Sequence, residues 1–272
     1  MHLLYCDETN LEERAGDFLL YGGLMVEGAS AGELSAAIDG IRARHGVPRN
    51  YLLKFNPGPS KFSHQRFIAL KQDVLAAARE HGAKLLVYAV LHDIARSPDE
   101  ARRNGISTVC FHFHCALNWI KGAPGLVLID RFNDQGNLID QHLRDKFTIG
   151  LTGMPYSAEM RLPNIVGFHY SAIGQSHFPS ILDVAVGSLR FAVNALTRHQ
   201  EQHMATAREL LGLLSPMFWR AAPTGPVTEL GFMFSPKVIK AAKYREKYQA
   251  LKDFLTECGI NIAQTITDER TY

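Results

Sequence analysis

The sequence predicts an α/β fold in which a mixed sheet of five strands is flanked by helices. Short apolar runs of strand length alternate with longer segments in which apolar residues recur at helical spacing. The first two runs, HLLYC and DFLLYGGLMV, are joined by the polar stretch TNLEERAG and should form an antiparallel hairpin. The later runs are separated by helices and can lie parallel, which makes the sheet mixed.

The N-terminal hairpin and the helix after it carry recognisable boundary signals. The adjacent Gly22 and Gly23 interrupt the second strand and are expected to mark a bulge. In residues 30–45, Ser30 is followed three residues later by a glutamate and then by apolar residues at helical spacing. This pattern predicts an amphipathic helix with a capping box at its start.

The rest of the chain alternates between predicted strands and helices. The run KLLVYAVL predicts a strand covered on both faces, and GLVLID and NIVGFHYSA predict two more. Asp134 is expected to cap the helix that ends near Phe147, and Pro179 is expected to begin one that ends near His199. The other helices are expected at residues 63–81, 99–121, 202–220 and 236–258.

The composition restricts the classes of protein to which the chain can belong. With 272 residues, 46% apolar and 21% charged, it suits one core over residues 1–200 and a helical C-terminal extension, residues 201–272, packed on it. The net charge of +2 is compatible with a nucleic-acid partner but far below that of a dedicated electrostatic binder. The four cysteines form no CxxC pair, so neither a zinc site nor a disulfide framework is expected. Because no apolar run approaches the ~20 residues of a membrane span, we expect a cytoplasmic protein without a membrane segment.

Two aspartates stand at the ends of predicted strands. Asp7 ends the first strand and Asp130 ends the fourth. In open α/β sheets, ligands bind beyond the carboxyl ends of parallel strands, so the two side chains would meet if these strands are neighbours. Each also has a simpler interpretation, in which Asp7 caps the turn after its strand and Asp130 begins the turn DRFND.

A third aspartate lies in the apolar helix PSILDVAVGSLRFAVN. Asp183 shares a narrow stripe with Gly187, Arg190 and Asn194, while apolar residues cover the rest of the helix. An unpaired carboxylate in such surroundings would cost several kcal/mol, so a cation or an arginine should lie nearby. The alternative is that Asp183 only offsets the positive helix N-terminus. Converging carboxylates without His or Cys favour Mg²⁺ or Mn²⁺ over zinc.

The segments YCDETN, LVLIDRFND and HYSAIGQSHFPSILDVAVGSLRF resemble motifs of the bacterial family catalogued as domain of unknown function 3800. The resemblance covers roughly residues 3–195. It implies a ribonuclease H-like fold and a metal-dependent nuclease. It assigns the metal-binding role to the carboxylates of Asp7, Asp130 and Asp183, with Glu8 beside the first. It also places Ser176 and His177 just upstream of the last core helix.

The chain departs from the family pattern in two places. The segment YLLKFN keeps Lys54 but has Leu52 where the family often has an acid, and SILDVAVG keeps only the aspartate of its motif. The implied mechanism is two-metal phosphodiester hydrolysis, with Asp7 shared by both ions and Asp130 and Asp183 each holding one. Lys54 or His177 would neutralise charge or assist proton transfer.

Two other functions fit the sequence. The missing acid favours a ribonuclease H-like binding or defence-associated interaction module without turnover. An enzyme acting on small phosphorylated molecules is the second, although the chain has neither a P-loop nor a GxGxxG fingerprint.

Several tempting residues have structural interpretations. Glu8 alone is expected to be solvated, and His112 and His114 of FHFHC, two positions apart on a helix, are expected to be structural or surface groups. A basic face is expected on the last helix, either solvated or in contact with a nucleic-acid backbone. Its residues are Lys237, Lys240, Lys243, Arg245, Lys247 and Lys252.

Overall fold

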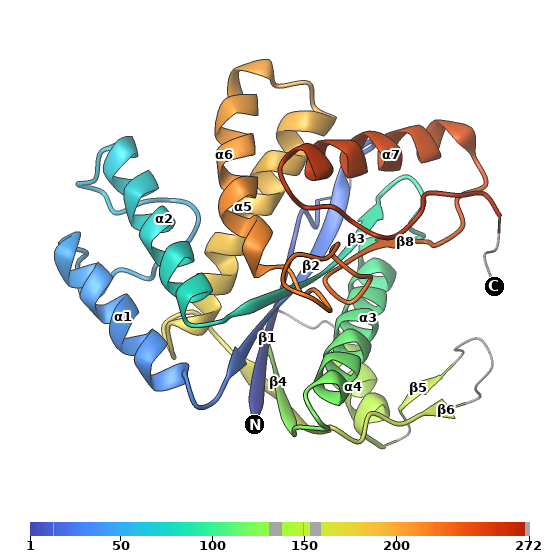
Figure 1. Ribbon diagram of the computed structural model, residues 1–272, viewed down its shortest axis with the longest axis horizontal. Helices are drawn as coiled ribbons and strands as arrows, with labels where there is room; N and C mark the ends of the chain where they lie inside the picture. Colours follow the sequence, from blue (N-terminus) through green and yellow to red (C-terminus); the bar gives the residue numbers. More distant parts are fainter. Residues whose placement is uncertain (13, 131–137, 149, 153–158, 270–272) are drawn as a thin grey trace.

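The computed structural model is an α/β protein with one large mixed sheet and helices on both faces (Figure 1). It describes residues 1–12, 14–130, 138–148, 150–152 and 159–269. The strands are β1 His2–Thr9, β2 Phe18–Glu27, β3 Lys84–Leu91, β4 Gly125–Asp130, β5 Leu151–Thr152, β6 Glu159–Met160, β7 Ile165–Ser171 and β8 Phe232–Ser235. The α-helices are α1 Ala31–Arg44, α2 His64–Glu80, α3 Pro98–Trp119, α4 Leu138–Thr148, α5 Phe178–Thr197, α6 Met204–Leu214 and α7 Ala242–Glu257.

The main sheet has six strands in the order β7-β4-β1-β2-β3-β8. The hairpin β1–β2 is antiparallel, as is β2–β3, while β1–β4, β4–β7 and β3–β8 are parallel. Within this sheet β2 therefore runs against the five other strands. The predicted combination of an antiparallel opening hairpin with later parallel strands is confirmed.

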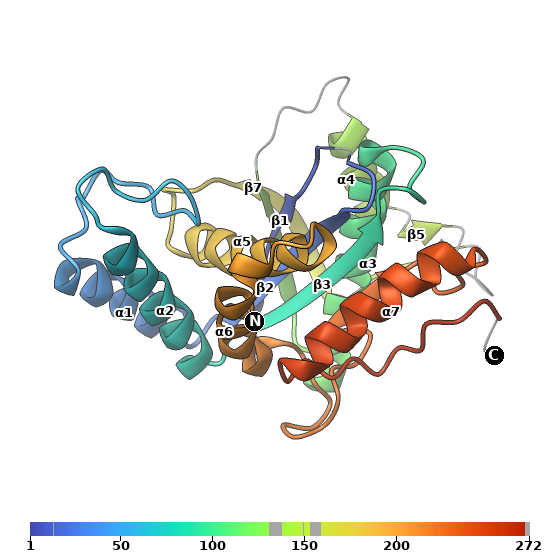
Figure 2. The same ribbon diagram turned by 90° about the horizontal axis from the view of Figure 1, so that it is seen from above.

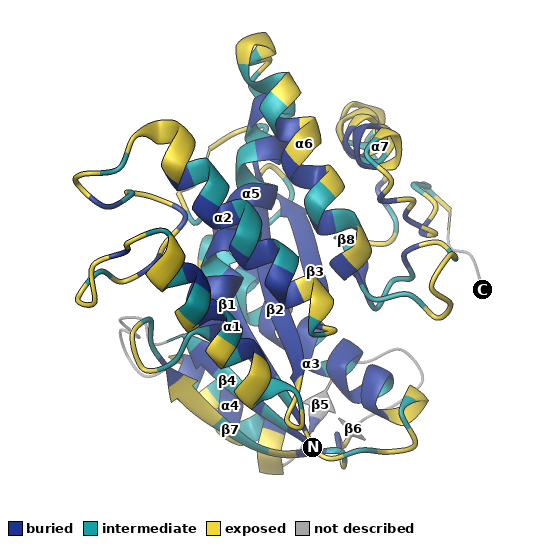
Figure 3. Ribbon diagram, turned by 60° about the vertical axis from the view of Figure 1, so that its left-hand side comes forward, coloured by how far each residue is buried: buried dark blue, intermediate teal, exposed yellow. Residues whose placement is uncertain are grey.

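Helices cover the two faces of the sheet unequally. One face packs against α5, behind which lie α1, α2 and α6, and the apolar side of α7 joins the same core. The other face packs against α3, with α4 beside it (Figure 2). Figure 3 shows β2 and β3 buried in the middle of the sheet, whereas the edge strand β7 has exposed residues. The alternation of side chains along β1 therefore decides which helix each of its residues faces.

The predicted bulge at Gly22 and Gly23 is not formed. Both glycines sit in continuous register with β1 and β3. A Cβ added to Gly22 would lie 2.3 Å from Val186 on α5, and one added to Gly23 would lie 2.8 Å from Val109 on α3. The glycines therefore allow both helices to approach the central strand closely.

The prediction of five strands is wrong by one, because β8 adds a sixth strand from the C-terminal region. Phe232 and Phe234 of this strand are fully buried, so part of residues 201–272 belongs to the same sheet. The run FMFS has only four residues, which is too short to distinguish from a loop by periodicity. The helix expected over residues 236–258 accordingly begins later, at Ala242.

Three helix ends differ from expectation or lie outside what is described. Ser30 makes no capping bond to α1, because its hydroxyl donates to the Glu27 carbonyl instead. The helix expected over residues 202–220 ends at Leu214, where Pro216 follows in a 3₁₀ turn. The predicted cap Asp134 lies outside the described residues.

Helix α5 is the central helix of the fold. Among the described helices it is the one long and apolar enough, by length and composition, to cross a membrane, but 67% of its apolar window is buried inside the protein. It packs against β1, β2, α2 and α6. Its apolar character is accounted for by this central position.

Candidate functional site

Asp7 and Asp130 lie side by side at the carboxyl ends of parallel strands. Cys6 of β1 pairs with Ile129 of β4, so the aspartates occupy the next position on each strand. Cys6 and Ile129 belong to the core under α3, and the alternation of side chains therefore turns both aspartates toward α5. The two carboxylates line one small recess, together with Ser171 of β7. The predicted meeting of these strand ends is confirmed.

The sequence predicted that the first strand ends at Asp7, and this is wrong. β1 continues to Thr9, because β2 supplies backbone partners as far as Leu20. Asp7 is therefore held between two strands, opposite Gly22, rather than in a loop. The interpretation of Asp7 as a turn cap is wrong for the same reason.

Asp183 lies on α5 beside this recess, which Leu182 and Pro179 also line. Its carboxylate accepts a hydrogen bond from the backbone N–H of Phe55 at 2.6 Å. The partner is thus a backbone donor from the loop before α2, where the sequence predicted a cation or an arginine. Asp183 also lies beyond the first turn of α5, which contains no acidic residue. The interpretation that Asp183 only offsets the positive helix N-terminus is therefore wrong.

The rest of the polar stripe on α5 is explained by packing. A Cβ on Gly187 would lie 2.5 Å from the Phe55 side chain, and the Arg190 guanidinium lies 5.9 Å from the centre of the Phe55 ring. Asn194 exchanges amide hydrogen bonds with Asn10 at 2.8 and 3.1 Å. Gly187 and Arg190 therefore hold the Phe55 loop against the helix, and Asn194 joins the helix to Asn10 just after β1.

Burial, and after it the negative charge of neighbouring carboxylates, makes Asp7 a weak acid. Burial, followed by the nearby charges of Glu8, Asp130 and Asp183, raises the pKa of Asp7 to about 8 from its usual 3.8. The N–H of Glu8, which donates to Asp7 Oδ1 at 2.8 Å, offsets part of this rise. A nearby cation would remove the repulsion and keep Asp7 ionised at neutral pH.

The aspartates are gathered in one region but are not arranged as a finished ligand set. Among the described residues, no group of three or more His, Cys, Asp and Glu side chains could hold a metal ion. The donors on this side of the sheet are nevertheless hard oxygens, which suit Mg²⁺ or Mn²⁺. Asp7 and Asp130 are the pair closest to that chemistry, because they line the same recess.

Glu8 lies on the opposite face of the sheet from Asp7. Its carboxylate forms an ion pair with Arg102 of α3, with Oε1 and Nε 3.1 Å apart. The two side chains are only 6% and 13% exposed, so the expectation that Glu8 is solvated is wrong. Burial raises the pKa of Glu8 despite the opposing effect of Arg102.

Lys54 and His177 lie away from the recess. Lys54 is exposed on the loop, one residue before Phe55. His177 immediately precedes α5, and its Nε2 lies 2.9 Å from Oδ1 of Asp39 on α1. Neither side chain lines the recess around Asp7 and Asp130.

No protein-family model matches this chain, and no curated protein matches it. The functional interpretation therefore depends on the geometry of the recess and of its surroundings.

The two histidines of FHFHC are buried, as a structural role predicts. Burial lowers the pKa of His112 to about 4, which keeps it neutral at physiological pH. His114 Nε2 lies 3.3 Å from the side-chain amide of Asn118. Both rings belong to the buried residues of α3.

Intramolecular contacts occupy the basic residues near the C-terminus. Lys247 pairs with Asp93, and Lys252 donates to the Gln264 carbonyl. Arg245 pairs with Asp268 in the C-terminal segment. Lys237 and Lys240 precede α7 and contact Glu229 and the Asp268 carbonyl, and Lys243 of α7 lies over the Tyr244 ring. These cations therefore hold the C-terminal region together rather than form one free helix face.

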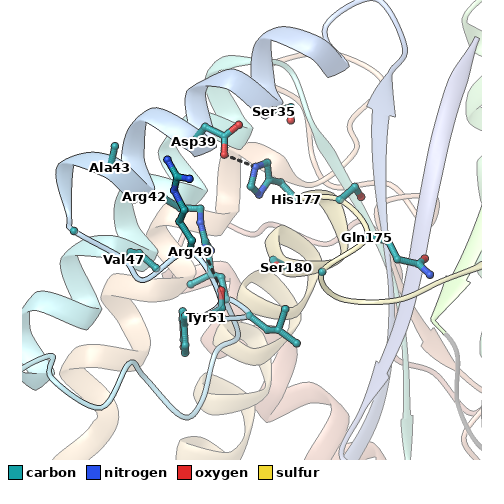
Figure 4. Close-up of a pocket in the computed structure, with 15 residues that line it drawn as sticks. Ser35, Asp39, Arg42, Ala43, Val47, Arg49, Tyr51, Gln175, His177 and Ser180 are labelled. Carbon is teal, nitrogen blue, oxygen red and sulfur yellow. Dashed lines mark hydrogen bonds and ion pairs between the residues drawn. The ribbon is translucent and has the colours of Figure 1, made fainter.

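Sequence reasoning missed a groove beside the recess. It has a volume of about 1030 Å³ and lies between α1, the loop after it and the segment that begins α5 (Figure 4). Arg42, Arg49, Tyr51 and Ser180 are among its lining residues. The Pro- and Gly-rich character of residues 55–62 was the only nearby signal, and it indicates a loop without revealing a groove.

Proposed function

We propose that this protein is a divalent-metal-dependent nuclease of ribonuclease H-like fold, related to the family that its motifs resemble. The fold assignment is supported by a central β1 with the reversed β2 on one side and the parallel β4 on the other. The observation that carries the proposal is the pair Asp7 and Asp130, side by side near the carboxyl ends of β1 and β4 and facing α5.

Asp7, Asp130 and Asp183 would supply the carboxylate oxygens that hold Mg²⁺ or Mn²⁺, with Asp7 shared between two ions. Bound there, the ions would acidify the attacking water and neutralise charge on the scissile phosphate. Asp7 and Asp130 are fixed by their strands, so their positions depend little on side-chain freedom. The Phe55 N–H fixes the carboxylate of Asp183.

Glu8, Lys54 and His177 take supporting roles in this proposal. Glu8 adds negative charge near Asp7 while its own carboxylate pairs with Arg102. Lys54, exposed beside the Phe55 loop, would contact a phosphate of the substrate. His177 would keep the start of α5 against α1 through Asp39.

Cleavage of labelled single-stranded and duplex DNA and RNA, with Mg²⁺, Mn²⁺ or EDTA, tests the proposal. We expect metal-dependent cleavage by the wild type and a loss of at least about 100-fold in Asp7→Asn and Asp130→Asn. Asp253→Asn is the matched control, because Asp253 is exposed on α7 away from the recess. No metal-dependent cleavage by the wild type, or equal cleavage by Asp7→Asn, would refute the nuclease.

A second function is favoured by two observations. Leu52 stands where the family often has an acid and is 51% exposed, and the described carboxylates form no finished ligand set. Both suit a binding or defence-associated interaction module that retains the fold without turnover. Stabilisation by Mn²⁺ in a thermal melt without any hydrolysis would favour this module.

A further inference from the structure

The groove beside the carboxylates has the chemistry of a phosphate-binding surface. Two arginines line it, and its acid, Asp39, is already paired with His177. Arg42 donates to the carbonyls of Pro48 and Tyr51 at 3.1 and 2.9 Å, which shapes the loop that forms one wall. A surplus of fixed positive charge in a concave surface attracts anions.

Arg49 is the cation most available to a ligand. It is exposed at the groove, and among the described residues no hydrogen bond or ion pair engages its guanidinium. Arg44, a few residues earlier, is paired with Asp73 at 3.8 Å and does not line the groove. The two arginines therefore carry the same charge, but only Arg49 lines the groove and only Arg44 is in an ion pair.

The opposite wall is the start of α5, and it offers a serine hydroxyl. Ser180 is 5% exposed and lines the groove, and the described part of the chain gives its hydroxyl no hydrogen-bond partner. It lies in the first turn of a 20-residue helix, where backbone N–H groups also favour an anion. The Ser180 oxygen is not among the fully buried unpartnered side-chain atoms of the described residues, so its hydroxyl remains free to donate a hydrogen bond to a ligand in the groove.

The groove lies next to the recess of the aspartates. The segment that begins α5 contributes Ser180 to the groove and Pro179 to the recess. On the other side, the loop that contains Tyr51 continues to Phe55, whose N–H holds Asp183. A chain molecule lying in the groove would therefore continue toward Asp7 and Asp130.

The shape of the groove decides between single and double strands. His177 and Asp39 join its two walls at 2.9 Å and so bound a groove whose volume is close to that of a small-molecule site, which suits unpaired nucleotides rather than a duplex. Its volume of about 1030 Å³ is at the upper end of small-molecule sites and exceeds the needs of a single small anion. The half-buried Tyr51 ring beside the arginines suits stacking of an unpaired base.

We propose that this groove binds a short stretch of single-stranded nucleic acid and directs it to the carboxylate recess. Arg49 and Ser180 contact the phosphates, and Arg42 shapes the wall of the groove. The inference rests on the proposed function, because it names the strand on which that site would act.

Binding of a labelled single-stranded 12-mer to the full chain, measured by fluorescence anisotropy in EDTA, tests the inference. Arg49→Gln should weaken binding about tenfold at low salt and reduce the slope of log K against log salt by about 1. Arg44→Gln, the matched control, should bind like the wild type. Ser180→Ala should weaken binding about threefold, because it removes one hydrogen bond to a phosphate.

Four outcomes would overturn the inference. They are no binding by the wild type, equal binding by Arg49→Gln, equal binding of a duplex of the same sequence, and equal affinity for a 5′-mononucleotide. The last would identify a small-anion site instead. Binding is measured without metal, so the two proposals can fail separately. If the protein binds the 12-mer but never cleaves nucleic acid, only the nuclease proposal is contradicted. If the wild type cleaves with metal but Arg49→Gln binds the 12-mer normally, only the groove proposal is contradicted.

Discussion

The carboxylate of Asp183 accepts the backbone N–H of Phe55 at 2.6 Å, across 128 residues of sequence. This bond joins the central helix α5 to the loop before α2 at the edge of the candidate site. It gives Asp183 a structural role in addition to the proposed metal-binding role, and the two roles can be separated by substitution.

Asp183→Ala should lower the free energy of unfolding by about 1–3 kcal/mol, because it leaves the Phe55 N–H without its acceptor. Asp183→Asn keeps an oxygen acceptor and should cost less than 1 kcal/mol, on the order of the uncertainty of a urea titration. Both variants should lose metal-dependent cleavage. Equal stability of the alanine variant and the wild type would contradict the structural role of this bond.

Asp7 should destabilise the metal-free protein at neutral and higher pH. Its pKa is about 8 in the folded protein and near 3.8 when unperturbed, so between these values the folded state binds more protons than the unfolded state. The stability of the wild type in EDTA should therefore carry a penalty that grows as the pH rises from about 4 to about 8. Asp7→Asn lacks this penalty and should be more stable by up to roughly 5 kcal/mol at pH 8, and equally stable near pH 4.

Urea titrations of both proteins at several pH values measure this difference. Saturating Mn²⁺ should then stabilise the wild type and leave Asp7→Asn nearly unchanged. A difference between the two proteins that does not vary with pH would contradict the raised pKa.

Glu8 should matter for folding more than for metal binding. Its ion pair with Arg102 is largely buried, so Glu8→Gln should cost about 1–3 kcal/mol by removing the charged partner of Nε, while Asp99 still contacts Nη1 of the same guanidinium at 3.4 Å. The double variant Glu8→Gln, Arg102→Met should recover part of that loss, as measured by chemical denaturation. A large fall in Mn²⁺ affinity with unchanged stability would instead place Glu8 among the metal ligands.

A side chain at position 22 should destabilise the fold, because α5 approaches β2 closely there. An added Cβ would lie 2.3 Å from Val186 Cγ1, so Gly22→Ala should cost about 1–3 kcal/mol, and Val186→Ala should restore part of it. Gly32→Ala, on α1 with nothing within 4 Å of the added Cβ, is the matched control and should stabilise by roughly 0.5–1 kcal/mol. Equal melting temperatures of the two variants would contradict the close approach of α5.

The sequence predicts elements well where apolar runs are continuous and long. The runs KLLVYAVL and GLVLID form β3 and β4 with the predicted bounds, and the position of Asp130 at the end of β4 follows from them. The strand β8 was missed, because its four residues carry no periodicity and its burial depends on pairing with β3. Local signals thus identify strands that are long enough to form a pattern.

Contacts at the site are less accessible to sequence reasoning. The adjacency of Asp7 and Asp130 could be predicted, since both end strands that were expected in one sheet. To predict that Glu8 forms an ion pair with Arg102, one would need to know how α3 is positioned on the sheet, which no local pattern specifies. The bond from Phe55 to Asp183 likewise depends on where a loop far away in the sequence passes.

The most direct test of the central claim is a crystal structure of the protein soaked in Mn²⁺, with anomalous scattering used to locate the ion. We expect a manganese peak with oxygens of both Asp7 and Asp130 about 2.2 Å away, in octahedral coordination. A well-ordered structure with no peak between these two carboxylates, or with manganese bound only elsewhere, would contradict it.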